Sequence, residues 1–110
     1  MAAETDLDFI VYLGDYIYEA GFATQPGTVE PAHPTITLPS GGCYADTLDD
    51  YRTLHRTYRG DARLQTVHTR FPVIAIWDDH EFFDDCWQNL QTYTNANLQQ
   101  AARRRAANQA

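Results

Sequence analysis

The sequence contains no lysine, and its 8 basic residues, all arginines, are outnumbered by 15 acidic residues, which gives a net charge of −7. An acidic surface repels phosphate backbones, so we expect no nucleic-acid partner. The sequence also lacks an apolar run of the roughly 20 residues that span a bilayer, and its N-terminal residues show neither the basic nor the apolar region of a signal peptide. We therefore expect no membrane contact and no visible export signal in these residues.

Cysteine is scarce as well. Cys43 and Cys86 are the two cysteines, and their spacing fits no zinc motif. They permit one disulfide, but the favoured interpretation is two reduced thiols. A chain of 110 residues with an apolar share of 44% is sufficient for one globular domain at most.

The most informative stretch is Phe71 to Glu81, which has the sequence FPVIAIWDDHE. β-Branched and aromatic residues from Val73 to Trp77 predict a strand that is buried on both faces. Three carboxylates and an imidazole follow at once, in Asp78 to Glu81. Because ligands of open α/β sheets bind at the carboxyl ends of the strands, these four residues are a candidate metal or phosphoryl site. A solvated acidic turn is the alternative.

A second apolar run, Phe9 to Leu13, ends in the same way, in a turn and a carboxylate at Gly14 and Asp15. Two such runs predict neighbouring parallel strands, 9–13 and 73–77, with functional groups at their carboxyl ends. Helices are expected in the crossover connection between them. The predicted fold class is therefore α/β.

The crossover contains signals for two helices. Thr47 is the predicted start of the first, with Asp50 as its capping-box partner, and Gly60 ends it. Asp61 is the predicted N-cap of the second, which runs from Ala62 to about Thr69.

The other segments carry weaker signals. Residues 21–46 are rich in glycine and proline, so we expect a long loop, either a functional lid or a poorly ordered segment. Residues 82–94 are expected to be loop with short turns. Asn95 to Ala110 has high helix propensity but few large apolar side chains, so we expect a helix whose packing partner is missing.

Asp15 and Tyr18 form the first candidate pair of ligands. They lie three residues apart after the first strand, where a carboxylate and a phenolate can converge on one hard cation. The alternative is a tyrosine at the edge of the core beside a capping aspartate.

Asp79 and His80 form the complementary pair. Asp79 can bind a second metal, and His80 can donate to a phosphate oxygen or protonate a leaving group. A pairing of His80 with Asp78 or Glu81 at the surface is the alternative. Together with Asp15, the two strand ends can hold two cations about 3.5–4 Å apart, the spacing used against phosphoryl groups.

Three segments of the sequence carry a family resemblance: LGDYIYE at 13–19, TLDDYRTLHRTYRGDARLQTVH at 47–68 and FPVIAIWDDHE at 71–81. In that order and spacing they resemble the metallophosphatase domain of the PhoD-like alkaline phosphatases, over about Asp8 to Ala110. The resemblance implies a fragment of a calcineurin-like metallophosphoesterase αββα sandwich. It also implies a centre of Fe³⁺ and Ca²⁺, with other divalent metals as alternatives, that hydrolyses small-molecule phosphate monoesters and diesters.

The resemblance also assigns roles to single residues. Asp15 resembles the carboxylate that bridges the metals, Tyr18 the tyrosinate that binds ferric iron, and Asp79 a ligand of the second metal that also serves catalysis. His80 resembles the catalytic histidine near the substrate phosphate. The neighbouring residues of the motif are assigned to support of the loop and of the His80 orientation: Trp77, Asp78 and Glu81.

The differences from the family predict a partial metallophosphatase domain over residues 1–110. Family members are several hundred residues long and commonly exported, and the strands that bring their other ligands are not found here. We therefore expect exposed strand edges, an exposed apolar sheet face, and export for the full-length protein. The alternative function is that of a non-catalytic, truncated fragment or metal-binding remnant, and the oligomeric state is left open.

Overall fold

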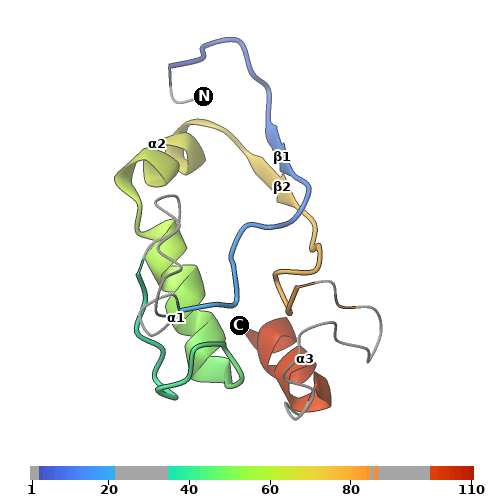
Figure 1. Ribbon diagram of the computed structural model, residues 1–110. Coiled ribbons are helices and arrows are strands. Elements are labelled where there is room, and N and C mark those ends of the chain that lie inside the picture. The colour runs from blue at the N-terminus through green and yellow to red at the C-terminus, as the bar shows by residue number, and fades with distance from the viewer. Residues whose placement is uncertain (1–2, 22–34, 85, 87–99) are drawn as a thin grey trace.

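The computed structural model describes residues 3–21, 35–84, 86 and 100–110 (Figure 1). Two short strands and three helices follow one another in the order β1, α1, α2, β2, α3. Their bounds are β1 Ile10–Tyr12, α1 Leu48–Arg59, α2 Ala62–Arg70, β2 Val73–Ala75 and α3 Gln100–Gln109. The predicted α/β class with two parallel strands is confirmed, and both strands lie within the predicted ranges but are shorter. Among the described residues, no helix has the length and apolar character needed to cross a bilayer.

The two strands form a parallel pair, with Ile10 opposite Val73 and Tyr12 opposite Ala75. Side chains alternate between the two faces of a sheet, so these four residues share one face, on which Ile10 packs against α2. The opposite face is open: Val11 is 45% exposed and Ile74 is 54% exposed. The prediction of a strand buried on both faces is wrong because no described element covers this second face. The expectation of an exposed apolar sheet face is confirmed.

Helix α1 begins as predicted, at a capping box. The Thr47 hydroxyl accepts a hydrogen bond from the Asp50 amide, and the Asp50 carboxylate accepts one from the Thr47 amide. Asp50 does more than the sequence indicates, because its fully buried carboxylate also accepts from the amides of Ser40 at 2.9 Å and Asp46 at 3.2 Å. It therefore joins the start of α1 to the preceding segment. Asp61 caps α2 as predicted.

The described part of the predicted long loop, residues 35–46, has no helix or strand but contributes to the core. Ile36, Leu38 and Ala45 are buried with Ile17 of the segment after β1 and Leu54 of α1. Residues 22–34 of this loop lie outside the described residues. In its described part the segment supports the core and fixes the chain that leaves β1.

Helix α3 packs against α1 (Figure 1), and its Ala106 is 8% exposed within the same core. The expectation that this helix lacks a partner is therefore wrong; its small side chains allow close contact instead. Residues 95–99 of the predicted helix and most of the predicted loop 82–94 lie outside the described residues. No disulfide joins Cys43 and Cys86, as predicted.

Candidate metal centre

The chain leaves β1 through two consecutive residues with positive φ, Gly14 at 106° and Asp15 at 53°. A Cβ atom at Gly14 would lie 2.2 Å from the Cβ of Asp78, so only glycine allows the two strand-end loops to approach this closely. Aspartate is one of the few other residues that tolerate the left-handed region. The sequence Gly14-Asp15 therefore brings the first candidate ligand directly beside the loop that follows β2.

Glu81 holds these two loops together. Its Oε2 accepts hydrogen bonds from the amides of Asp15 at 3.1 Å and Asp78 at 2.7 Å, and its Oε1 accepts from Tyr16 at 2.5 Å and Ile17 at 3.4 Å. The residue is only 5% exposed. A buried carboxylate is stable where backbone donors satisfy its oxygens. This arrangement agrees with the loop-supporting role that the sequence assigned to Glu81.

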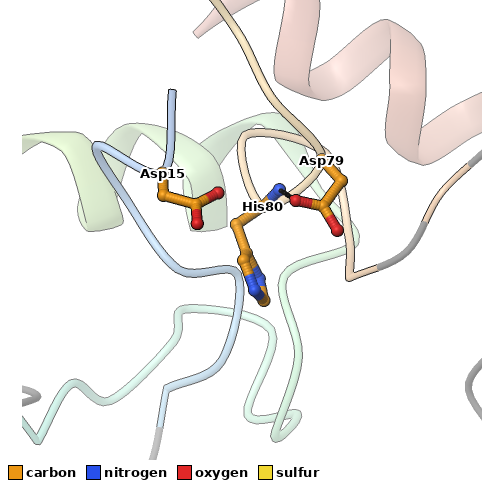
Figure 2. Close-up of side chains that lie close together, drawn as sticks. All are labelled: Asp15, Asp79 and His80. Carbon is orange, nitrogen blue, oxygen red and sulfur yellow. Dashed lines mark hydrogen bonds between the residues drawn. The ribbon is translucent and has the colours of Figure 1, made fainter. Parts of the chain in front are cut away.

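Asp15, Asp79 and His80 come together at the carboxyl ends of β1 and β2 (Figure 2). Each offers one ligand atom, and these atoms all lie within 4.8 Å of one another. The Asp15 carboxylate points toward the 79–80 turn, in which an oxygen of Asp79 accepts the backbone N–H of His80 at 3.0 Å. The structure therefore contains the predicted juxtaposition of the two strand-end carboxylates. Their action as metal ligands stays a prediction.

The imidazole of His80 interacts with Glu19, while one of its ring nitrogens lies within 4.8 Å of carboxylate oxygens of Asp15 and Asp79. Its Nδ1 lies 2.9 Å from a carboxylate oxygen of Glu19, which is 1% exposed, and its Nε2 lies 3.4 Å from Asp84. The hydrogen bond to Glu19 raises the pKa of His80 to about 9, against the opposing effect of burial. At neutral pH the ring is therefore an imidazolium.

Sequence reasoning missed Glu19 and offered Asp78 or Glu81 as the partner of His80. That interpretation is wrong, and Glu19 rather than the neighbouring carboxylates orients the ring. The partner lies 61 residues away in the chain, so periodicity and spacing give no sign of the pair. The only available signal is the position of Glu19 at the end of the GDYIYE motif.

Tyr18 lies near both Asp15 and His80. Its ring packs on His80 with 4.2 Å between ring centroids, and its hydroxyl lies near enough to Asp15 for that carboxylate to act on it. Burial raises the pKa of Tyr18, and the negative charges of Asp15 and Asp79 raise it further. The phenol therefore keeps its proton. The structure brings Asp15 and Tyr18 together as the sequence predicts.

The sequence model of the family described as PhoD-like phosphatase matches residues 1–110. The chain belongs to this family. It is 39% identical over 82 residues to alkaline phosphatase D of Bacillus subtilis (strain 168), a match that covers 72% of the chain and 13% of that protein. A solved structure titled "Structure of PhoD" superposes with a TM-score of 0.71 at 33% identity, over 97% of the chain and 19% of the other.

The family membership confirms the resemblance found in the sequence. The chain spans only 13% of the length of the curated relative and 19% of that of the solved structure. The matched segment includes Asp15, Tyr18, Asp79 and His80. The activity of the longer relatives is proposed for this PhoD-like chain below.

The donor atoms present fit a hard cation. Carboxylates and a phenol are oxygen ligands of the kind that calcium and ferric iron accept. Burial raises the pKa of Asp15, and although His80 opposes this, the charges of Asp79 and Asp78 raise it further. Clustered like charges of this kind are relieved when a cation binds between them. His80 fits less well as a ligand, because both of its nitrogens face carboxylates.

Proposed function

We propose that this chain belongs to a metal-dependent phosphoesterase and supplies part of its active site. The observation that supports the proposal best is the meeting of Asp15 and Asp79 at the ends of two neighbouring parallel strands, with ligand atoms within 4.8 Å, in a PhoD-like chain. In this proposal residues 1–110 are part of a metallophosphatase domain whose complete fold is a calcineurin-like αββα sandwich.

Asp15, Tyr18 and Asp79 would hold the metals: Asp15 and Tyr18 would bind ferric iron, and Asp15 and Asp79 would bind a second ion, calcium or another divalent metal. When bound, such ions polarise a phosphoryl oxygen and neutralise the charge that develops on it. The Tyr18 phenol lies near Asp15, the carboxylate with which it would share the ion.

His80 would act on the substrate as a hydrogen-bond donor. As an imidazolium it can stabilise a negatively charged phosphoryl oxygen or protonate the leaving group. Its Nδ1 is held by buried Glu19 at 2.9 Å, whereas its Nε2 has a longer contact of 3.4 Å with the more exposed Asp84. Nε2 is therefore the nitrogen that would donate a hydrogen bond to a substrate oxygen, while Glu19 keeps the ring in place.

A non-catalytic, metal-binding role is the second candidate. Two observations favour it: the apolar face of the sheet is open, with Ile74 at 54% exposure, and the chain matches only 13% and 19% of the length of its relatives. In this case the chain would bind a cation through Asp15 and Asp79 without completing the machinery for turnover.

Hydrolysis assays distinguish the two candidates. We expect a protein that carries this chain within a complete metallophosphatase domain to cleave p-nitrophenyl phosphate or bis(p-nitrophenyl) phosphate when Ca²⁺ and Fe³⁺ are supplied, and the ratio of the two rates gives the preference for monoester or diester. Asp15→Asn and Asp79→Ala should each lower the rate by at least about a hundredfold, since each removes a metal ligand. Asp49→Asn, an exposed position in α1, is the matched control and should leave the rate unchanged.

The assays have two informative outcomes. Turnover that is unaffected by both site variants would overturn the assignment of the site. Metal binding without turnover of either ester would support the non-catalytic role.

By the same family relationship we propose that the whole protein is exported. Fractionation of the source cells tests this, and a protein found only in the cytoplasmic fraction would contradict it.

A further inference from the structure

A second candidate binding site lies behind the metal centre, between the sheet and the corner formed by α1 and α2. A cavity of about 210 Å³ opens there, and residues from both strands, both helices and the loop after β2 line it. The side chains that matter for its chemistry are Tyr16, His55, Arg59, His68, Trp77 and Glu81. Asp15, Asp79 and His80 are not among the lining residues, so the cavity is separate from the candidate metal centre.

Two of the residues that line the cavity carry a polar atom without a partner among the described residues. The hydroxyl of Tyr16 and Nε2 of His68 are buried without a hydrogen bond in the described part of the chain. Nearly all buried polar groups of folded proteins are satisfied, and a group left alone is costly. The Tyr16 ring lies 6.0 Å from that of His68 and 6.5 Å from that of His55, between ring centroids. Aromatic neighbours therefore hold these unsatisfied groups in fixed positions.

Positive charge gathers at the same place. Arg59 lines the cavity and also two adjoining hollows of about 460 and 360 Å³, both of which Arg56 shares. Arg52 lines the smaller of these hollows, so three arginines follow one face of α1 at helical spacing. None of the three has an ion-pair partner among residues 3–21, 35–84, 86 and 100–110. Such a basic surface stands out in a chain whose net charge is −7.

Glu81 contributes a negative charge to the lining, but its carboxylate oxygens are occupied by backbone donors. Both of its oxygens accept backbone N–H groups from the two strand-end loops. Arg59 forms no ion pair with Glu81, and with Arg56 and Arg52 beside it positive charges outnumber the negative charge of Glu81 at this surface. The volume is far above the roughly 10–15 Å³ that a single bridging water needs, so a larger polar ligand has room.

We propose that this cavity binds a small tetrahedral oxyanion, such as phosphate or the phosphoryl group of a small ester. Arg59 offers paired N–H donors of the geometry that suits phosphate oxygens. The Tyr16 hydroxyl and His68 Nε2 are buried, so each would need a rotation of its side chain to supply a further hydrogen bond to the anion. The site is independent of the proposed phosphoesterase function. Tyr16 nevertheless donates its backbone N–H to Glu81, the carboxylate that joins the two strand-end loops. An anion bound in the cavity would therefore lie beside a residue that supports the candidate metal centre.

The test is an NMR titration of the chain with inorganic phosphate, at constant ionic strength and with a chelator present so that no metal-bound site can capture the anion. We expect saturable shifts of the Tyr16 amide and of the His55 and His68 ring signals. Sulfate should produce the same shifts and chloride none, while phenyl phosphate tests whether the cavity admits an ester.

Arg59→Gln should weaken phosphate binding at least about tenfold, because it removes a charge-assisted contact, and Arg59→Lys should have a smaller effect. Arg63→Gln is the matched control: it makes the same change in charge, but Arg63 is exposed, pairs with Asp61 and lies outside the cavity lining, so binding should be unchanged. Circular dichroism confirms that each variant folds. If Arg59→Gln does not fold, Tyr16→Phe keeps the ring, removes one donor and should weaken binding severalfold.

Three results would overturn the proposal. The first is an absence of saturable shifts with the unaltered chain. The second is an equal effect of Arg59→Gln and Arg63→Gln. The third is a set of phosphate-induced shifts centred on Asp15 and His80 instead of the cavity. Because the titration is done without metal, failure of the phosphoesterase proposal would not alter these outcomes.

Discussion

Glu81 and Asp50 are buried carboxylates that hold the chain by the same kind of contact in two different regions. Each accepts hydrogen bonds from at least three backbone amides. Asp50 joins the start of α1 to residues 40–47, whereas Glu81 joins the two loops that carry Asp15 and Asp79. The same chemistry therefore stabilises a helix in one region and positions candidate metal ligands in the other.

Asp50 and Asp15 show that carboxylates of this acidic chain have two different environments. Burial works to raise the pKa of Asp50, yet the hydrogen bonds from Ser40, Thr47 and Asp46 lower it overall. Burial raises the pKa of Asp15, and nearby carboxylates raise it further despite His80. Asp50 is satisfied by backbone donors, while Asp15 stands among like charges. This difference separates a structural carboxylate from a candidate metal ligand.

The largest expected effect comes from Glu81→Ala. The change leaves backbone amides of both strand-end loops without their acceptor, so the free energy of unfolding should fall by more than about 3 kcal/mol, and Ca²⁺ should bind at least tenfold more weakly. Urea denaturation and calorimetric titration measure the two quantities. Glu81→Gln, which keeps one acceptor oxygen, should lie between the two proteins. Unchanged Ca²⁺ affinity in a folded Glu81→Ala variant would contradict the positioning role.

Asp50→Ala should separate stability from metal binding. Loss of a buried acceptor for three amides is expected to lower the free energy of unfolding by about 2–3 kcal/mol, while the affinity for Ca²⁺ stays within twofold. Asp49→Ala, at the exposed neighbouring position, should change stability by less than about 1 kcal/mol. The comparison between the two regions fails if Asp50→Ala weakens Ca²⁺ binding as much as Glu81→Ala does.

The smallest expected effect is a loss of stability at high pH from the His80–Glu19 pair. The pKa of His80 is raised from 6.5 to about 9, so its contribution is complete below pH 6.5 and disappears as the pH rises through 9. We expect a decline on the order of 1–2 kcal/mol, less than the shift alone would give because solvent reaches part of the ring. Urea denaturation from pH 6 to pH 10 measures it. In Glu19→Gln the decline should be reduced, and an equal decline in both proteins would contradict the pairing.

Local signals in the sequence predict much of this fold. The caps at Thr47 and Asp61 and the β-branched runs that become β1 and β2 depend on residues a few positions apart. The meeting of Asp15 and Asp79 also follows from the sequence, because parallel neighbouring strands place their carboxyl ends together.

Side-chain contacts between segments far apart in the chain, beyond the meeting of the two strand ends, could not be predicted. The Glu19–His80 pair and the role of residues 35–46 in the core arise from contacts between segments far apart in the chain. The exposure of Ile74 depends on which elements cover the sheet, and an apolar run by itself does not say whether a cover is present. These contacts need the three-dimensional arrangement.

Calorimetric titration with Ca²⁺ tests most directly whether the two strand-end carboxylates share a metal. The chain, Asp15→Asn and Asp79→Asn would be compared under identical conditions, with Asp49→Asn as the control of equal charge. Each site variant should bind Ca²⁺ at least about tenfold more weakly than the unaltered chain, and the control should match it. Equal Ca²⁺ affinity in all four proteins would contradict the shared site.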